Sequence, residues 1–128
     1  MTKATYVDGF VFVVPKKNLA AYRKMAQLGK KIWMKHGALD YKECVGDDLK
    51  TKSMGGMKPL SFVQLNNTKS GETVWFSFIT YKSKKHRDQV NASVMKDPAM
   101  NGPQMKNVPM PFDMKRFTYG GFKVVVGP

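Results

Sequence analysis

Cysteine is almost absent from this sequence of 128 residues, because Cys44 is the only one. A single thiol excludes a disulfide within the chain and a cysteine-rich metal site. Long apolar stretches are also absent, since no run approaches the ~18 residues that a membrane-spanning helix needs. The first ten residues, MTKATYVDGF, contain no apolar core of a signal peptide. We therefore expect a soluble, cytoplasmic protein that binds no metal ion, no other cofactor and no membrane.

Acidic residues are scarce as well. The chain has 9 Asp and Glu against 22 Lys and Arg, which gives a net charge of +13 at pH 7. Such an excess attracts nucleic acid, anionic membrane surfaces or anionic metabolites, and it is equally compatible with a merely soluble basic protein. Apolar residues make up 42% of the chain, which is enough for a hydrophobic core. The length fits a single domain, residues 1–128.

The apolar residues predict six main elements in the order strand, helix, strand, strand, helix, strand. β-Branched and aromatic residues mark the strands, whereas the helices have apolar residues on one face. Strands are expected at 5–14, 38–46, 73–81 and 116–126. Helices are expected at 16–36 and 84–97. This order predicts an α+β fold, a ferredoxin-like β-α-β-β-α-β sandwich with an antiparallel sheet and both helices on one face.

The sheet face without helices is expected to be apolar. Strand 73–81, TVWFSFITY, is apolar on both sides, so one side would be a large apolar patch in water unless something covers it. We expect a homodimer that forms through this exposed sheet face. Three other segments are less regular. Segment 60–66 is ambiguous between a strand and an irregular stretch, 98–113 is long and irregular, and Gly120-Gly121 is expected to form a bulge.

Helix 16–36 is predicted to have a basic outer face. On a helical wheel, apolar residues such as Trp33 fall on one half, and basic residues without any acid among them fall on the other. His36 lies on the apolar half. It is either a base that lines a pocket or a histidine at the edge of the core that bonds to the backbone.

The stretch KSKKHRDQVN, residues 82–91, resembles the kinase catalytic loop H-R-D-x-x-x-x-N. Its Asn comes too early, however, and no G-x-G-x-x-G loop precedes it. Ser83 is expected to cap helix 84–97. His86 and His36 are the catalytic candidates, because histidine is the residue type suited to proton transfer near neutral pH. Arg87 is a candidate to grip a carboxylate or phosphate. The alternative is that the stretch is only the solvated start of a helix.

The remaining candidates for ligand binding are Arg116, Tyr119, Tyr41 and Trp33. Arg116 is a second candidate for an anion clamp, and Trp33 and Tyr41 would form apolar walls. Arg116 and Tyr119 are expected to point to opposite faces of one strand, so only one of them reaches a cavity. The alternation of strand 38–46 places one set of residues on a common face: Leu39, Tyr41, Glu43 and Val45.

Four stretches of the chain carry a resemblance to a known family. They are YVDGFVFVVPKKNLAAYRKMA, KHGALDYKECVGDD, YKSKKHRDQVN and MPFDMKRFTYGGF. Together they resemble the YbaA-like family, domain of unknown function 1428, over nearly the whole chain, from Tyr6 to Val126. Met114 departs from the family pattern, which usually has Gly after the Asp. The resemblance implies a dimeric α/β-barrel fold and no established activity.

Three functions remain open at this point. The first is a dimer that binds a small anionic or aromatic metabolite in a cavity between helices and sheet, near 98–113. Fold analogy suggests a cofactor-independent oxygenase or isomerase for it. The second is a nucleic-acid-binding module without sequence specificity, because the chain lacks the aromatic signature of an RNA-recognition sheet. The third is a structural or regulatory dimer without a ligand.

Overall fold

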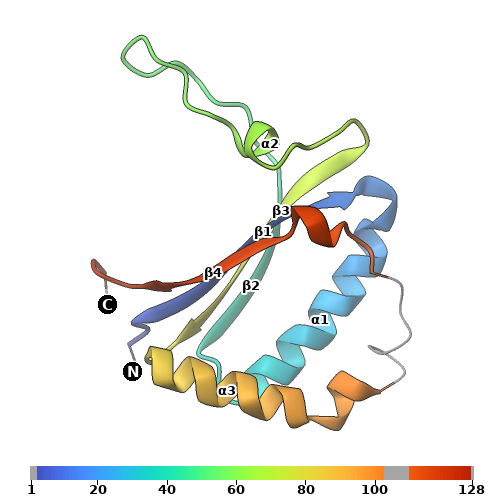
Figure 1. The fold of residues 1–128 in the computed structure, drawn as a ribbon, viewed down its shortest axis with the longest axis vertical. Coiled ribbons are helices and arrows are strands. Elements are labelled where there is room, and N and C mark those ends of the chain that lie inside the picture. The colour runs from blue at the N-terminus through green and yellow to red at the C-terminus, as the bar shows by residue number, and fades with distance from the viewer. Residues whose placement is uncertain (1–2, 103–109, 128) are drawn as a thin grey trace.

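The computed structural model describes residues 3–102 and 110–127 (Figure 1). Its strands are β1 (Tyr6–Pro15), β2 (Asp40–Val45), β3 (Glu72–Tyr81) and β4 (Thr118–Lys123). Its α-helices are α1 (Leu19–Lys35), α2 (Phe62–Leu65) and α3 (Lys84–Lys96). The described residues also form three single turns of 3-10 helix: η1 (Lys16–Asn18), η2 (Pro98–Asn101) and η3 (Met114–Arg116).

The strands form one four-stranded sheet in the order β2-β3-β1-β4, and all neighbours are antiparallel. The predicted α+β class with an antiparallel sheet is therefore confirmed. α1 and α3 lie on the same side of the sheet (Figure 1). Along β3, Trp75, Ser77 and Ile79 are buried beneath these helices, whereas Phe76 on the opposite side is exposed. One face of the sheet is thus covered, and we call the other the open face.

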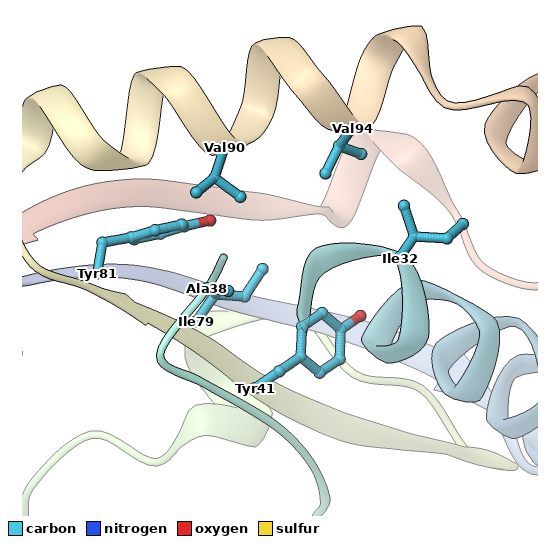
Figure 2. Packing of buried hydrophobic residues seen from close by; sticks show 7 residues of the cluster. All are labelled: Ile32, Ala38, Tyr41, Ile79, Tyr81, Val90 and Val94. Carbon is cyan, nitrogen blue, oxygen red and sulfur yellow. The ribbon is translucent and has the colours of Figure 1, made fainter. Parts of the chain in front are cut away.

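Two apolar clusters fill the space between the helices and the sheet. One joins the ends of α1 and α3 to β2 and β3 (Figure 2) and contains Ile32, Ala38, Tyr41, Ile79, Tyr81, Val90 and Val94. The other lies between the first half of α1 and the centre of the sheet and contains Phe12, Val14, Tyr22, Ala26 and Trp75. Phe112 and Phe117 pack against the second cluster, so the segment just before β4 covers it.

The predicted helix starts are largely confirmed. Ser83 caps α3, because its side chain accepts a hydrogen bond from the His86 backbone N–H at 3.0 Å. Pro15 precedes the first helical turn, but residues 16–18 form a 3-10 turn and the α-helix begins at Leu19. Segment 60–66 contains the short helix α2. Its capping box between Ser61 and Gln64 is a local signal that supports a helix start.

The predicted bulge at Gly120-Gly121 is wrong. β4 pairs with β1 without interruption from Val11 opposite Thr118 to Tyr6 opposite Lys123. Position 121 requires glycine for a different reason, because a Cβ there would collide with the Tyr6 ring. The strand is also shorter than 116–126. Within segment 98–113, residues 98–101 form η2, and residues 103–109 lie outside the described part of the chain.

Candidate functional site

Glu43 on β2 is a carboxylate that receives three hydrogen bonds beneath α1. Its Oε1 accepts one from the Tyr22 hydroxyl at 3.0 Å and one from Trp75 Nε1 at 2.7 Å. Its Oε2 accepts one from the Tyr41 hydroxyl at 2.7 Å. Tyr22 belongs to α1, Trp75 to β3 and Tyr41 to β2. Three elements therefore direct polar groups at one carboxyl group on the covered side of the sheet.

The alternation of β2 turns Glu43 toward the helix. Tyr41 is buried and Glu43 is half-buried, whereas Lys42 and Cys44 between and beyond them are exposed. Gly29 of α1 leaves room for this arrangement, because a Cβ at that position would lie 2.8 Å from the Tyr41 hydroxyl oxygen. The glycine thus allows α1 to approach β2 closely enough for Tyr41 to reach Glu43.

An aromatic cavity of about 190 Å³ lies between α1 and the sheet, and Glu43 forms part of its wall. Half of the lining residues are aromatic, among them Phe12, Tyr22, Trp33, Tyr41, Phe112 and Phe117. An apolar cavity of about 150 Å³ is large enough to bind benzene. The aromatic cavity therefore has room for one six-membered ring.

The hydrogen-bond capacity of Glu43 is not exhausted. A carboxylate offers about four acceptor positions, and Tyr22, Trp75 and Tyr41 use three of them. Burial, reinforced by the charge of Glu43, raises the pKa of the Tyr22 and Tyr41 hydroxyls above the usual value. Both hydroxyls therefore stay protonated and remain donors at neutral pH. Oε2 thus keeps one acceptor position without a hydrogen bond from the described residues.

A second, larger pocket of about 400 Å³ shares part of its wall with the aromatic cavity, including Glu43. Arg23, Lys30 and Lys42 line it, and all three are exposed. Lys42 is paired with Asp40 at 3.0 Å. The cations favour an anionic group in this cationic pocket, whereas the carboxylate of Glu43 opposes one.

His86 lies at the start of α3, away from the residues that line the aromatic cavity. Its Nδ1 accepts a hydrogen bond from the Lys82 backbone N–H at 2.9 Å. Its ring meets Tyr81 edge to face, with the ring centres 5.9 Å apart. The imidazole therefore closes the turn between β3 and α3, which is a structural role.

Arg87 bridges α3 to the sheet. Its Nη1 donates a hydrogen bond to Asp8 at 2.8 Å, and its Nε donates one to Asp88 at 2.7 Å. The guanidinium also lies over the Tyr6 ring, 5.1 Å from the ring centre. Burial raises the pKa of Asp8, although the charge of Arg87 opposes the increase. The donors of Arg87 thus serve an internal ion pair.

His36 ends α1 and binds a carboxylate. Its Nε2 lies 2.6 Å from Asp97 Oδ2, and Lys35 Nζ lies 3.1 Å from the same oxygen. The Ala99 backbone N–H donates to the other oxygen of Asp97 at 2.9 Å. This backbone hydrogen bond, followed by those from His36 and Lys35, lowers the pKa of Asp97 to about 2. The cluster ties the end of α1 to the turn after α3.

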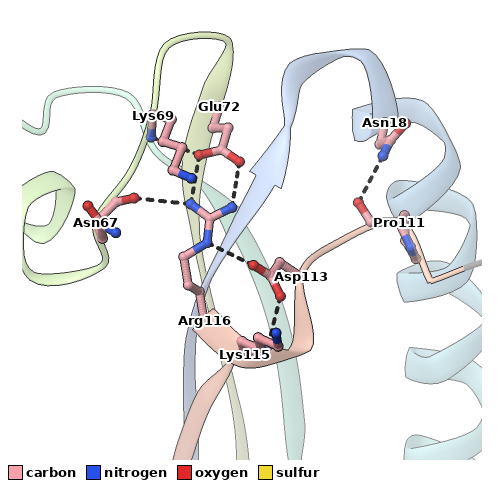
Figure 3. A network of polar contacts seen from close by, with 8 residues as sticks. All are labelled: Asn18, Asn67, Lys69, Glu72, Pro111, Asp113, Lys115 and Arg116. Carbon is pink, nitrogen blue, oxygen red and sulfur yellow. Dashed lines mark hydrogen bonds and ion pairs between the residues drawn. The ribbon is translucent and has the colours of Figure 1, made fainter.

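Arg116 is the centre of a polar network that joins η3 to the start of β3 (Figure 3). Its Nη1 and Nη2 bind the two oxygens of Glu72 at 2.8 and 2.7 Å. Its Nε donates to Asp113 at 3.1 Å, and its Nη1 also donates to the Asn67 carbonyl at 3.1 Å. These contacts engage the guanidinium on all its edges. The hydrogen bonds from Arg116 lower the pKa of Glu72 to about 2.

The structure brings together only two of the residues chosen from the sequence. Trp33 and Tyr41 both line the aromatic cavity, with ring centres 6.2 Å apart. The Trp33 indole N–H is bound to Asn91 at 3.1 Å. Tyr119 stacks on Phe10 at the covered side of the sheet edge but is itself 71% exposed.

Glu43 was not among the residues selected from the sequence. The signal was present, because the alternation of strand 38–46 already placed Glu43 on the same face as Tyr41. A carboxylate on a face that is otherwise apolar is costly to bury unless donors surround it. Such a residue is a stronger site candidate than a histidine at an exposed helix start.

The described residues, 3–102 and 110–127, contain no group of three or more His, Cys, Asp or Glu side chains placed to hold a metal ion. Within the same residues, no helix is long and apolar enough to cross a membrane.

The fold and the site define an α+β protein with an antiparallel sheet, two covering helices and a carboxylate in an aromatic cavity. The family model described as "Protein of unknown function (DUF1428)" matches residues 5–114, and the chain belongs to this family. The chain is similar to "Uncharacterized protein YbaA" of Escherichia coli strain K12, with 38% identity over 121 residues, 94% of this chain and 97% of the relative. "Uncharacterized protein YbaA" of Shigella flexneri matches with the same identity and coverage.

Proposed function

We propose that this protein binds a small aromatic molecule in the aromatic cavity and anchors it through Glu43. The observation that carries the proposal is the carboxylate itself, held by Tyr22, Trp75 and Tyr41 in the wall of a cavity that is otherwise mostly apolar. Binding sites for small molecules are usually apolar hollows with a few placed polar groups. The size of the cavity selects a ligand with one ring.

The polar partner of Glu43 in the ligand is an N–H or O–H group. Glu43 is an acceptor, so a donor on the ring completes its hydrogen bonds, and a carboxylate at the same place is repelled. A phenol-like or aniline-like ring therefore fits better than a benzoate-like one. An anionic substituent is better accommodated in the cationic pocket beside Arg23 and Lys30.

Glu43 is also the residue best placed for acid–base chemistry. A carboxylate within hydrogen-bond distance of a ring O–H is positioned to take part in its proton transfer. Chemistry of this kind fits an isomerase or an oxygenase that needs no cofactor. His86 and His36 then have structural roles, since both are bound to groups outside the cavity.

A homodimer through the open face completes the proposal. Phe76 on β3 is 42% exposed there and Phe122 on β4 is 62% exposed, and a second copy would cover both. The sheet order β2-β3-β1-β4 with two helices on one face supports a ferredoxin-like sandwich and a dimeric α/β barrel.

Binding of nucleic acid without sequence specificity is a second candidate. The observation that favours it is the outer face of α1, where the basic residues Arg23, Lys24, Lys30, Lys31 and Lys35 are all exposed. Such binding depends on released counterions and weakens steeply with salt. A structural dimer that binds neither class of ligand is the third possibility.

A thermal-shift experiment tests these functions against one another. The probes are phenol, anisole, which has the same ring without a donor, benzoate and a short RNA, each at low and high salt. We expect phenol to raise the melting temperature at both salt concentrations, and anisole and benzoate to raise it less. A shift with RNA alone that high salt abolishes would favour the second candidate. No shift with any probe would contradict binding in the cavity.

A further inference from the structure

The segment between β2 and β3 forms an arm that projects away from the sheet (Figure 1). Its tip is a tight hairpin, because Met54 and Met57 exchange two backbone hydrogen bonds of 2.6 and 3.0 Å. Gly55 and Gly56 between them have φ values of 58° and 81°, which a two-residue hairpin turn of this kind requires. The Thr51 hydroxyl also donates to the Pro59 carbonyl at 2.7 Å and ties the two limbs together.

The arm presents apolar side chains that its own chain does not cover. Met54 is 71%, Met57 77% and Leu60 64% exposed. Lys52 and Lys58 flank the two methionines in the sequence and are exposed too. A shaped hairpin with an apolar, cationic tip is unusual on a free surface, and methionine is a residue type suited to filling an irregular groove of a partner.

A groove with the complementary character lies at the base of the arm. It has a volume of about 370 Å³, and its apolar floor includes Val11 and Phe76 on the open face, together with Cys44. Asp47 and Asp48 also line it, and both are exposed. An apolar hollow with two carboxylates at its margin matches an apolar tip with two lysines in polarity and in charge.

We propose that the tip of the arm of one copy binds the groove at the base of the arm of a second copy. The groove begins where the arm begins, at Asp47 and Asp48. A twofold axis that places two arms side by side in opposite directions therefore brings each tip to the other copy's base. One contact is then formed twice, as in other symmetric dimers. The inference rests on the proposed homodimer and assigns to the arm a contact between its two copies.

The placement of Cys44 in the groove permits a direct test by disulfide trapping. One chain carries Met57→Cys and Cys44→Ser, so its only thiol is at the tip. The second chain is the wild-type protein with a distinguishing tag, and its only thiol is Cys44 in the groove. The two are mixed and treated with a mild oxidant that accepts the two electrons of the thiol pair. A disulfide forms only where the two residues lie a few ångströms apart.

We expect a disulfide between the two different chains on a non-reducing gel. The matched control is Met95→Cys with Cys44→Ser, because Met95 on α3 is also exposed, at 59%, but lies outside the arm. This control is expected to give less than a tenth of the mixed product. A second variant, Lys52→Glu with Lys58→Glu, is expected to weaken the dimer about tenfold in analytical ultracentrifugation, and adding Asp47→Lys with Asp48→Lys is expected to restore it.

The possible failures are distinguishable. A dimer in ultracentrifugation that gives no more mixed disulfide with Met57→Cys than with Met95→Cys would overturn the arm contact and leave the homodimer standing. A monomer at all concentrations would overturn both. Neither result bears on ligand binding at Glu43, whose cavity is built within one chain.

Discussion

The indole nitrogen of Trp75 donates a hydrogen bond of 2.7 Å to Oε1 of Glu43 across two neighbouring strands. Glu43 stands directly opposite Ser77, so Trp75 is its diagonal neighbour on the same face of the sheet. The register of β2 against β3 therefore fixes this contact. A shift of one residue would turn the carboxylate to the open face and remove the polar anchor from the cavity.

The hydroxyls that bind Glu43 are expected to contribute measurably to stability. Tyr22→Phe removes a donor at 3.0 Å from a half-buried carboxylate, and a hydrogen bond to a charged group contributes about 1.5–3 kcal/mol. Chemical denaturation should show a decrease of this size in the free energy of unfolding. Tyr119→Phe is the control, because Tyr119 is 71% exposed, and its change should lie within about 0.5 kcal/mol. Equal effects of the two substitutions would contradict the role of Tyr22.

Gly29 is expected to contribute to stability because it leaves room for the Tyr41 hydroxyl, and not because of its own backbone flexibility. In an ordinary helix interior, Gly→Ala stabilises by about 1 kcal/mol. Here the new Cβ would lie 2.8 Å from the Tyr41 oxygen and would push the hydroxyl away from Glu43. We expect Gly29→Ala to give no gain or a loss of stability in the wild-type background.

In a Tyr41→Phe background, where the hydroxyl is missing, Gly29→Ala is expected to give most of the stability gain seen in an ordinary helix. A double-mutant cycle by denaturation measures this difference as a coupling energy between the two positions. A gain of about 1 kcal/mol in both backgrounds would show that Tyr41 does not limit the approach of α1.

The sequence predicted the helices and strands better than it predicted the contacts between them. The long strands and helices were predictable, because their apolar patterns extend over many residues and bury one face. The helix α2 was not, since four residues carry no periodicity and only the Ser61–Gln64 capping box marks it. The Gly120-Gly121 pair was wrongly predicted to form a bulge. Glycine is required at position 121 because the Tyr6 ring of β1 leaves no room for a Cβ, and Tyr6 is distant in the sequence.

The candidate site was predictable only in part, because many of its contacts join residues that are far apart in the sequence. Trp33 and Tyr41 were chosen from the sequence and do line the cavity. Arg87 and Arg116 were chosen because arginine can bind anions, but their partners Asp8 and Glu72 are 79 and 44 residues away in sequence. No local pattern could show that these guanidinium groups are engaged by distant carboxylates.

The assignment of Arg87 to an internal ion pair leads to a further prediction. Breaking a buried pair by removing one partner costs about 3–5 kcal/mol, because the other charge stays buried. The Arg87 side chain is 19% exposed and that of Asp8 is 7% exposed, so we expect the lower part of this range for Arg87→Leu. The affinity for phenol should stay within a factor of about two, because Arg87 is not in the cavity wall.

The matched variant for this prediction is Arg87→Leu combined with Asp8→Asn. It removes the unpaired charge as well and should recover part of the lost stability. Unchanged stability of Arg87→Leu, together with weaker binding of phenol or benzoate, would return Arg87 to the role of a ligand clamp.

The pair of Arg116 with Glu72 is expected to give stability that depends on pH. The pKa of Glu72 is lowered from 4.5 to about 2 in the folded protein, chiefly by the hydrogen bonds from Arg116. A carboxyl group with a lowered pKa stabilises the fold above pH 4.5, and this contribution is lost as the pH falls toward 2. Glu72→Gln should therefore destabilise the protein at pH 7, and the difference from wild type should vanish near pH 2.

Denaturation curves between pH 2 and pH 7 measure this difference. Asp88→Asn is the control at pH 7, because the Asp88 side chain is 61% exposed and its surface ion pair with Arg87 is worth at most about 1 kcal/mol. A constant difference between Glu72→Gln and wild type over the whole pH range would mean that Arg116 does not hold the charge of Glu72.

The most direct test of the proposed site is a calorimetric titration of phenol into the wild-type protein and into the variant Glu43→Gln. The substitution keeps the size and one acceptor of the side chain but removes the charge. Hydrogen bonds to a charged acceptor exceed neutral ones by about 1 kcal/mol, which corresponds to a roughly fivefold change in affinity. We predict that wild type binds one phenol per chain and that the substitution weakens binding by at least this factor. Equal affinities, or no binding to the wild type, would contradict Glu43 as the anchor of a ligand.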